Sequence, residues 1–376
     1  MRNVLFIAPT TYKLPLDSNM SKKFDYLSQI CNLNVVAFAN EKKQFSLQNT
    51  NLYFYKKTSS RFYNYLKIIT VSLFSISKII KNNNIEIVSF QDPVSSFLSM
   101  FIIKARHKNL KVIVETHGDF IETLGLEKNL LFPGFYRFLF MKLAGYTINK
   151  ADIIRAVSSS TEAQVRAINK TKDIVRFPAW VDFDDFKDIE LNRGNNPNFQ
   201  ILFIGSVTDR KKPHVIIEAM NRIKKNNVEL LIVGPTPNPK YLETLKDLIA
   251  KYELDENVKF FGSVDREEVK SFYSKINLMI LPSVSEGLAR VIFESQATAC
   301  PVLVTDAPGM GDIVIDGQTG FVFESNNIES LAEKINEIEE NYDEATHIGR
   351  NAKEFILNNY SADNFKFSFK KIFDTV

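Results

Sequence analysis

Two glutamates in the stretch SVSEGLARVIFES (283–295) have a spacing that could hold a ligand. The apolar pattern predicts a helix from about Gly287 to Thr298, which separates the carboxylates of Glu286 and Glu294 by about 12 Å along its axis. A glycosidase acid–nucleophile pair needs roughly 5–9.5 Å, so that chemistry is not favoured. The spacing fits the two ends of an extended ligand that carries hydroxyl groups.

The predicted helix begins between these carboxylates, and a helix N-terminus offers unpaired N–H groups and a positive dipole end to phosphate. Gly287 allows the ligand to approach the backbone closely. A nucleotide sugar fits this pattern, with ribose at one glutamate, a hexose at the other and the diphosphate at the helix end. The spacing alone also fits one structural and one surface glutamate.

A basic loop follows the apolar run ILFIGS (201–206) and places Arg210 and Lys211 between a strand end and a helix start. Cationic side chains there can reach the same diphosphate and stabilise a departing nucleoside diphosphate. Gly205 permits a close turn. The evidence for Lys212 and His214 is weaker, and a solvated basic surface is the alternative for the whole loop.

His117 in VIVETHGDF lies at the end of another predicted strand and is followed by Gly118. Its imidazole could bind a sugar hydroxyl or a phosphate, or it could be a structural histidine. No second His or Cys completes a metal set, so a metal site is not expected. The D-x-D match in VDFD (181–184) lies beside a linker and does not change this.

Two series of apolar strands alternate with helical stretches. Because continuous apolar strands separated by helices are typical of parallel sheets covered on both faces, the fold class is α/β with two Rossmann-like, doubly wound domains. The predicted strands are 4–9, 34–39, 86–91, 111–117 and 152–158, then 201–206, 229–234, 258–262, 278–283 and 301–305, with helices at 61–82, 93–106 and 131–149 in the first series.

The polar stretch 188–200 reads as the linker between the domains. The predicted N-terminal domain spans 1–187 together with a final helix at 361–376 capped by Ser361, and the C-terminal domain spans 188–360. Ligands of open parallel sheets bind at the carboxyl ends of strands, so two such domains facing one another would form a cleft.

The composition indicates the class of protein and its cellular environment. The chain has 376 residues, 45% of them apolar and 24% charged, as expected for two folded domains. Cys31 and Cys300 read as buried thiols in a reducing cytoplasm. No signal peptide and no run of 18 apolar residues is found, so no transmembrane helix is predicted.

The net charge of +3 is unevenly distributed. Residues 1–180 contain 25 Lys and Arg against 12 Asp and Glu, a net charge of +13. A basic half favours an anionic partner or an anionic membrane surface, with a solvated basic surface as the alternative. The aromatic-rich helices at 61–82 and 130–150 fit either ordinary core packing with a basic solvent face or peripheral attachment to an anionic leaflet. No DNA-binding motif is present, so nucleic acid is not an expected partner.

The order of the motifs along the chain resembles that of a known family. It runs from His-Gly at a strand end through G-S-x-x-x-R-K (205–211), FFGSV (260–264) and E-G-x-x-x-x-x-x-E (286–294) to PVLVTDAPG and DGQTGFVF. Over nearly the whole chain this resembles glycosyltransferase family 4, whose members are retaining enzymes of the GT-B fold. GLARV is similar to the branch that acts on polysaccharides and lipid-linked oligosaccharides.

The resemblance implies roles for individual residues. Glu286 would contact the donor hexose, Glu294 the ribose, and Arg210 and Lys211 the diphosphate, while His117 would lie near the transferred sugar. The remaining implied positions are the donor-side residues Gly205, Ser206, Val264, Gly287, Leu288 and Ala289 and the acceptor-side residues Thr10, Thr11 and Gly118. No metal or other cofactor is implied, and the final helix would cross back to the first domain.

Three positions depart from the family pattern. The first loop reads APTTYKLPLD without the usual Gly-Gly pair, Ser206 stands where an arginine is common, and Ala299 replaces a glycine at the end of the helix that carries Glu294. Alanine is less favourable than glycine in a left-handed helix cap, so a distorted helix end is expected.

The resulting functional hypothesis is a retaining hexosyltransferase. It would move a sugar from a nucleotide sugar, with UDP preferred, to a glycan or lipid-linked saccharide in surface polysaccharide or lipopolysaccharide synthesis, in the cytoplasm or peripherally on the inner membrane face. The alternatives are a nucleotide-sugar epimerase on the same plan and a non-catalytic nucleotide-sugar or membrane-binding protein. A dinucleotide-dependent oxidoreductase is not favoured, because no G-x-G-x-x-G is found.

Overall fold

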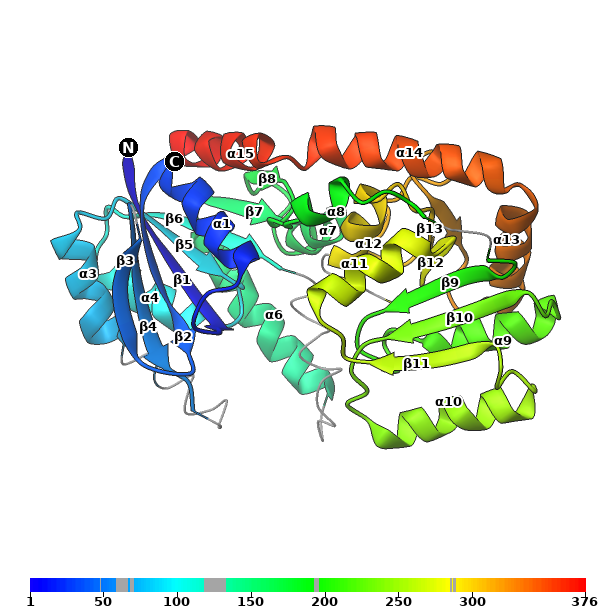
Figure 1. Ribbon diagram of the computed structural model, residues 1–376. Helices are drawn as coiled ribbons and strands as arrows, with labels where there is room; N and C mark the ends of the chain where they lie inside the picture. The colour runs from blue at the N-terminus through cyan, green and yellow to red at the C-terminus, as the bar shows by residue number, and fades with distance from the viewer. Residues whose placement is uncertain are drawn as a thin grey trace. The chain divides into compact units, whose positions relative to one another are not determined.

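The structure is a computed structural model that describes residues 1–47, 49–58, 67, 71–117, 133–192, 196–284, 286 and 289–376. The chain forms two compact units: unit 1 is Met1–Asp182 with Ala362–Val376, and unit 2 is Phe183–Ser361. Figure 1 labels their helices and strands. Each unit is described by itself.

Within the described residues, unit 1 contains an eight-stranded sheet in the order β3-β4-β2-β1-β5-β6-β7-β8. All neighbours pair in parallel except β3 and β4, which form an antiparallel edge pair. The strands are β1 (Arg2–Tyr12), β2 (Cys31–Ala39), β3 (Lys43–Leu47), β4 (Thr50–Lys56), β5 (Ile87–Gln91), β6 (Lys111–Thr116), β7 (Ile153–Ala156) and β8 (Ile174–Arg176).

Helices cover both faces of this sheet because consecutive residues of the central strands are apolar, so that both faces are buried. On β1, Leu5 and Ile7 pack in one cluster with α4, while Val4 and Phe6 pack in a second cluster with α1 and α15. The helices of unit 1 are α1 (Ser18–Ser28), the π-helical turn η1 (Ser72–Ile76), α3 (Ser77–Asn82), α4 (Phe97–Arg106), α6 (Pro133–Lys150), α7 (Ser159–Ile168) and α15 (Ala362–Thr375).

The C-terminal helix α15 is part of unit 1 although the whole of unit 2 precedes it in the sequence. Figure 1 shows α15 (red) beside α1 (blue). Its Phe369 contacts Phe6 of β1 with ring centroids 5.8 Å apart, and its Phe365 contacts Trp180 at 5.5 Å. The final helix therefore closes the core of the N-terminal unit.

Unit 2 contains, within its described residues, a six-stranded parallel sheet in the order β11-β10-β9-β12-β13-β14. The strands are β9 (Phe199–Ile204), β10 (Val228–Val233), β11 (Val258–Gly262), β12 (Leu278–Leu281), β13 (Val302–Thr305) and β14 (Phe321–Phe323). The helices are α8 (Asp184–Lys187), α9 (Pro213–Ile223), α10 (Pro239–Lys251), α11 (Arg266–Lys275), α12 (Arg290–Ala297), α13 (Ile328–Glu340) and α14 (Tyr342–Asn359).

The predicted α/β class with two doubly wound parallel sheets is confirmed. The unit boundary falls at 182/183 rather than at the predicted 187/188. The reason is aromatic packing: Phe183 stacks on Phe293 of α12 with centroids 6.4 Å apart, and Phe186 contacts Tyr273 of α11 edge-on at 5.6 Å. Residues 183–187 therefore belong to unit 2.

Ala299, which follows α12, adopts the left-handed conformation with φ of 59°. A Cβ added to Gly349 of α14 would meet the carbonyl oxygen of Ala299 at 2.3 Å, so this turn lies directly against the α14 backbone. Tight packing holds the alanine in a conformation that glycine adopts at lower cost.

No helix of the described residues is both long and apolar enough to cross a membrane. Cys31 and Cys300 are both buried and unpaired with each other.

Candidate active site

The carboxyl ends of β9 and β12 bring two cations onto one carboxylate in unit 2. Arg210 Nη1 and Lys211 Nζ each lie 3.1 Å from Glu286 Oε1, and Ser283 Oγ donates a hydrogen bond to the same oxygen at 2.8 Å. We call these four residues the cation–glutamate cluster. Glu286 and Lys211 are mostly buried, while the Arg210 side chain is 44% exposed.

Backbone hydrogen bonds hold the two loops of this cluster together. Val284 N donates to Arg210 O at 3.1 Å, and Glu286 N donates to Pro308 O at 3.3 Å. A Cβ on Gly309, whose φ is +92°, would meet Glu286 O at 2.0 Å, so only glycine allows this approach. The position of Glu286 is therefore fixed by its backbone as well as by its ion pairs.

Gly205 makes room for the lysine of the cluster. A Cβ at this position would meet Lys211 Nζ at 3.0 Å and its Cδ and Cε at 3.2 Å, and its φ of +141° also favours glycine. Lys211 therefore folds back over the end of β9, as the sequence-based prediction of a close turn required. The next residue, Ser206, is half-buried and belongs to the same turn.

The other polar residues of the basic loop have different partners. Lys212 adopts a left-handed conformation at the start of α9, and its ammonium donates to the side chain of Asn326. His214 Nδ1 lies 2.6 Å from the Tyr241 hydroxyl, and burial lowers its pKa. Neither belongs to the cation–glutamate cluster, in line with the weaker sequence evidence for both.

Glu294 occupies a different environment from Glu286. It lies on α12, half-buried, and accepts a hydrogen bond from the Tyr273 hydroxyl at 3.5 Å. Burial raises the pKa of this carboxyl, while the guanidinium groups of Arg290 and Arg266 partly oppose the rise. Glu286 is thus ion-paired with two cations, whereas Glu294 is hydrogen-bonded to the Tyr273 phenol.

The helix that carries Glu294 begins later than predicted. α12 starts at Arg290, because Ala289 has a non-helical ψ of 88° and its loop is tied to neighbouring segments. Glu286 therefore lies in a loop, and the predicted axial spacing of the two carboxylates does not apply. Ala289 is buried and no side chain caps the helix, whereas Gly287 and Leu288 lie outside the described residues.

Val264 lies two residues beyond β11 and is half-buried. It precedes Asp265, which caps α11 in a reciprocal capping box with Glu268. The neighbouring Phe261 ring is 44% exposed. This apolar surface at the end of β11 is compatible with the predicted contact to a base.

Unit 1 has a cavity of about 510 Å³ at the carboxyl ends of β1, β5 and β6. Its walls include Thr10, Tyr12, Lys23, Asp92 and His117. The structure thus brings the predicted acceptor-side Thr10 and the predicted His117 into one cavity. Thr11 is exposed and is not part of its lining, and Gly118 lies outside the described residues.

A buried ionic network lies behind His117. Glu115 is fully buried and accepts from Arg155 Nη1, from Ser89 Oγ at 2.7 Å and from His117 Nε2 at 3.3 Å. Burial would raise the pKa of Glu115, but Arg155 and His117 together hold it well below its ordinary value. The centroid of the Phe177 ring lies 4.2 Å from Arg155 Cζ, so an aromatic ring covers one face of the guanidinium.

Sequence reasoning missed several of these residues: Ser283, Gly309, Lys23, Glu115 and Arg155. The sequence contained a signal for Lys23, Glu115 and Arg155. Glu115 and Arg155 interrupt otherwise apolar strands, and a charge inside a buried strand requires a partner. Lys23 lies three residues after Met20 and four before Leu27, so helical periodicity places it on the apolar side of α1.

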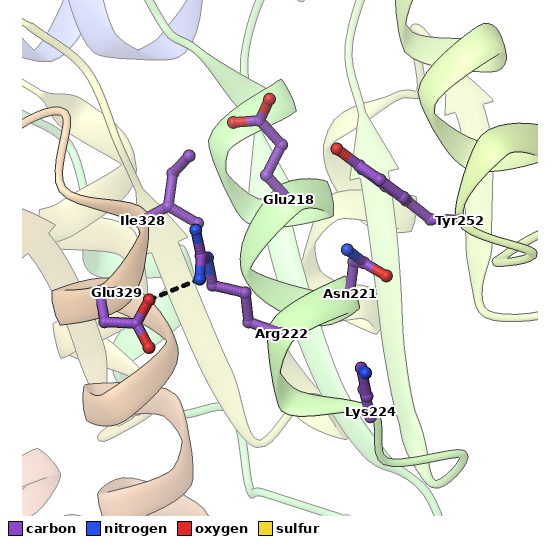
Figure 2. A pocket seen from close by; sticks show the side chains of 7 residues that line it. All are labelled: Glu218, Asn221, Arg222, Lys224, Tyr252, Ile328 and Glu329. Atoms are coloured by element: carbon purple, nitrogen blue, oxygen red, sulfur yellow. Dashed lines mark ion pairs between the residues drawn. The ribbon is translucent and has the colours of Figure 1, made fainter.

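A second hollow in unit 2, of about 500 Å³, contains none of the predicted site residues. Figure 2 shows it between the last turns of α9, Tyr252 and the start of α13, with Arg222 and Glu329 paired at 2.7 Å. Its lining residues lie on α9 and α13 and at the ends of α9 and α10, and none of them belongs to the loops that follow β9 and β12.

Comparison with known families places both parts of the chain. The model for glycosyl transferases group 1 matches residues 184–355, and the model for glycosyltransferase family 4 matches residues 31–185.

Among curated proteins, an uncharacterized glycosyltransferase of Methanocaldococcus jannaschii is 31% identical over 210 residues, which cover 56% of each chain. The capsular polysaccharide biosynthesis glycosyltransferase CapM of Staphylococcus aureus is 27% identical over 256 residues, covering 64% of this chain and 66% of CapM. The matched region thus spans between half and two thirds of the length of these two relatives.

Solved structures show similarity over the full length. Sucrose-phosphate synthase from Thermosynechococcus elongatus superposes with a TM-score of 0.78 at 16% identity, covering 100% of this chain and 99% of the other. HepE from Anabaena in complex with UDP superposes with a TM-score of 0.73 at 15% identity, covering 100% of both chains. At these identities the likeness concerns the fold.

Proposed function

The chain belongs to the group 1 glycosyltransferases of family 4 type and has the GT-B fold, and from this premise we propose that it is a retaining hexosyltransferase. In this proposal unit 2 binds a nucleotide-sugar donor and unit 1 binds a saccharide or lipid-linked acceptor. The observation that carries the proposal is the convergence of Arg210 and Lys211 on Glu286 at the carboxyl edge of the unit 2 sheet.

The cluster has the charge needed for a diphosphate. Two cations share one carboxylate, which leaves a net positive charge at a partly buried site. All three contacts fall on Glu286 Oε1. The Oε2 atom can then accept a hydroxyl of the donor hexose while the two cations bind the phosphate oxygens.

The same cations would lower the barrier to transfer. Cleavage of the bond between the sugar and the diphosphate builds negative charge on the leaving phosphate, and positioned cations stabilise that charge. Removal of one such donor in enzymes costs about 10²- to 10³-fold in kcat. In this proposal Arg210 and Lys211 supply the stabilisation that a metal ion supplies in other transferases, so no metal is required.

Glu294 would accept hydroxyls of the ribose, and the surface near Val264 would contact the base. A uridine nucleotide is our preferred donor, and the complexes of the HepE neighbour with UDP, and with UDP and glucose, support this choice. The name of CapM supports an acceptor in capsular or related surface polysaccharide synthesis.

The test is binding of nucleoside diphosphates and nucleotide sugars, measured by thermal shift and titration calorimetry. A ligand that binds only the folded state raises the melting temperature. We expect Arg210→Ala/Lys211→Ala to weaken binding of the preferred nucleotide by at least about tenfold and to lower kcat by at least about 10²-fold.

The matched control is Arg222→Ala/Lys224→Ala, which removes the same charge from the hollow in Figure 2. It should leave nucleotide affinity and turnover unchanged. Unchanged turnover at saturating donor in Arg210→Ala/Lys211→Ala would contradict the proposed role. Conversion of the nucleotide sugar without any acceptor would instead indicate an epimerase.

We further propose that the exposed apolar side chains of α4 and α6 contact an anionic membrane. Phe135 is 64% exposed, Phe138 60% and Phe101 53%, and the Lys142 ammonium lies 5.4 Å from the Phe138 ring. Exposed aromatics interleaved with cations are typical of surfaces that bind anionic lipid. The protein would then act on the inner face of the membrane.

This contact is tested by co-sedimentation with vesicles of phosphatidylglycerol and of phosphatidylcholine. Phe135→Ser/Phe138→Ser should reduce binding to the anionic vesicles without altering nucleotide affinity. Equal binding of the wild type to both vesicle types would contradict the electrostatic part of the proposal.

A further inference from the structure

Lys23 of α1 is a charged side chain in an apolar position. Its residue is only 8% exposed, and its neighbours Phe24 and Leu27 belong to the core of unit 1. It also contributes to the wall of the unit 1 cavity described above. Burial lowers the pKa of Lys23, although the nearby charge of Glu115 partly offsets this. The side chain is therefore largely buried, and Lys23 lies in the wall of the cavity.

Within the described residues Lys23 makes no hydrogen bond and no ion pair. The nearby carboxylates are already engaged: Glu115 accepts from Arg155, Ser89 and His117, and Asp92 Oδ1 accepts from two backbone N–H groups at 2.8 Å. The adjacent Lys22 differs, because its ammonium lies 2.8 Å from Asp182 Oδ1.

A buried cation without an ion-pair partner destabilises a folded protein, and an apolar side chain of similar volume would fit α1 better. Groups of this kind are typical of ligand sites, where binding restores the missing partner. The cavity volume of about 510 Å³ lies within the usual range for small-molecule sites. A bound ligand therefore accounts for the buried position of Lys23, whereas the packing of α1 does not.

We propose that the unit 1 cavity recognises an acceptor that carries an anionic group, a carboxylate or a phosphate, and that this group pairs with the Lys23 ammonium. The inference rests on the proposed function, because it identifies the cavity as the acceptor site. Tyr12 and His117 line the same cavity and can donate further hydrogen bonds to the ligand.

Asp92 narrows the chemical class. It lies in the same wall, and its left-handed backbone (φ of 80°) lets the carboxyl accept the N–H groups of Val94 and Ser95. A carboxyl beside the ligand disfavours a polyanion and favours a hydroxyl group as its neighbour. The inferred acceptor therefore combines one anionic group with hydroxyls, as in a sugar acid, a hydroxy acid or a sugar phosphate.

The test is titration calorimetry with glucuronate and with glucose 1-phosphate, with glucose as the uncharged probe. The full chain carries Arg210→Ala/Lys211→Ala in every sample, so that the cations of unit 2 do not bind the probes. Lys23→Met keeps the side-chain volume and removes the charge, Lys23→Arg keeps the charge, and Lys13→Met removes a charge from an exposed position nearby.

We expect at least one anionic probe to bind, with a dissociation constant about tenfold or more higher in Lys23→Met, unchanged in Lys13→Met and largely retained in Lys23→Arg. A carboxylate source is identified by glucuronate and a phosphate source by glucose 1-phosphate. Without a probe, Lys23→Met should melt at the same or a higher temperature than its parent, since it removes an unpaired buried charge.

The inference is overturned if neither anion binds, if both bind Lys23→Met as tightly as its parent, or if glucose binds as tightly as the anions. Nucleoside diphosphate binding to the chain with intact Arg210 and Lys211 separates the two proposals. If the nucleotide binds but the anions show no dependence on Lys23, only this inference fails. If no nucleotide binds, the proposed function fails first.

Discussion

At the scale of single residues, burial of Glu294 opposes the negative charge with which its carboxylate would bind ribose hydroxyls in the proposed function. The folded protein holds the Glu294 proton more tightly than the unfolded chain, because burial raises the pKa above its ordinary 4.5. The unfolding free energy therefore decreases as pH rises from about 4.5 through the folded-state pKa. Above the folded-state pKa of Glu294, its ionised carboxylate therefore lowers the stability of unit 2 relative to acidic pH.

This gives a prediction for Glu294→Gln. The amide removes the buried charge and can still accept a hydrogen bond from Tyr273, so the melting temperature should increase at pH 7 and should not increase at a pH below 4. Nucleotide affinity should decrease by about tenfold, because a hydroxyl loses its charged acceptor. Thermal melts at both pH values and calorimetry measure the two effects.

Glu243→Gln is the control, because Glu243 is exposed on α10. It should change neither the pH dependence of the melting temperature nor the affinity. A Glu294→Gln protein that is less stable at pH 7 would show that the carboxylate is stabilising and that burial is not the dominant influence.

The sequence predicted the cation–glutamate cluster better than it predicted the buried charges. Arg210 and Lys211 follow a strand end and could be placed from chain order alone, and Glu286 was found from its spacing and glycine neighbour. Lys23 could not be recognised in the same way. Its meaning depends on which carboxylates already have partners, and the Glu115–Arg155 pair joins strands 40 positions apart in the chain.

At the scale of elements, the end of α12 stores backbone strain at Ala299, whose φ is 59°. A left-handed alanine costs about 1–2 kcal/mol in backbone strain. Glycine relieves most of this strain, but it loses more conformational entropy than alanine when the chain folds. We predict that Ala299→Gly raises the unfolding free energy of unit 2 by about 0.5–1 kcal/mol. Denaturant titration measures this change.

Ala297→Gly removes the same methyl group from the buried end of the helix two residues earlier. It should destabilise unit 2 by about 1 kcal/mol or more. If both glycine variants are destabilising, the left-handed turn is not strained.

The elements that sequence reasoning found share strong apolar character. Every predicted strand of both series is present, whereas β3, β4, β8 and β14 were not predicted. β3 (KQFSL) is mostly exposed at a sheet edge, and β8 and β14 each have three residues, too few for a pattern. The predicted helix 61–82 falls partly outside the described residues, and its described part forms η1 and α3.

At the scale of the whole molecule, the core of unit 1 depends on the last residues of the chain. Four apolar residues of α15 are buried in it: Phe365, Phe369, Ile372 and Phe373. At about 1.5–3 kcal/mol for each buried side chain, they contribute roughly 6–12 kcal/mol. This is comparable with the entire stability of a typical domain, about 5–15 kcal/mol.

We therefore predict that deletion of residues 362–376 unfolds unit 1 and leaves unit 2 folded. The chain has one tryptophan, Trp180, which packs on Phe365 and Tyr26 in unit 1. Its emission should shift to longer wavelength in the truncated protein, while calorimetry should still detect nucleotide binding. Phe367→Ala, on the exposed side of the same helix, should leave the emission unchanged.

The opposite pattern, with native tryptophan emission and lost nucleotide binding, would contradict this assignment of α15 to unit 1.

The position of α15 also sets an order on biosynthesis. A ribosome adds about 5–20 residues per second, so the nascent N-terminal sheet would wait roughly 10–40 s for its closing helix while residues 183–361 are made. During that interval the apolar face of β1 lacks the cover that Phe369 later provides. Molecular chaperones that shield exposed strands of nascent polypeptides should therefore bind this protein before α15 is made and release it once α15 has packed in unit 1.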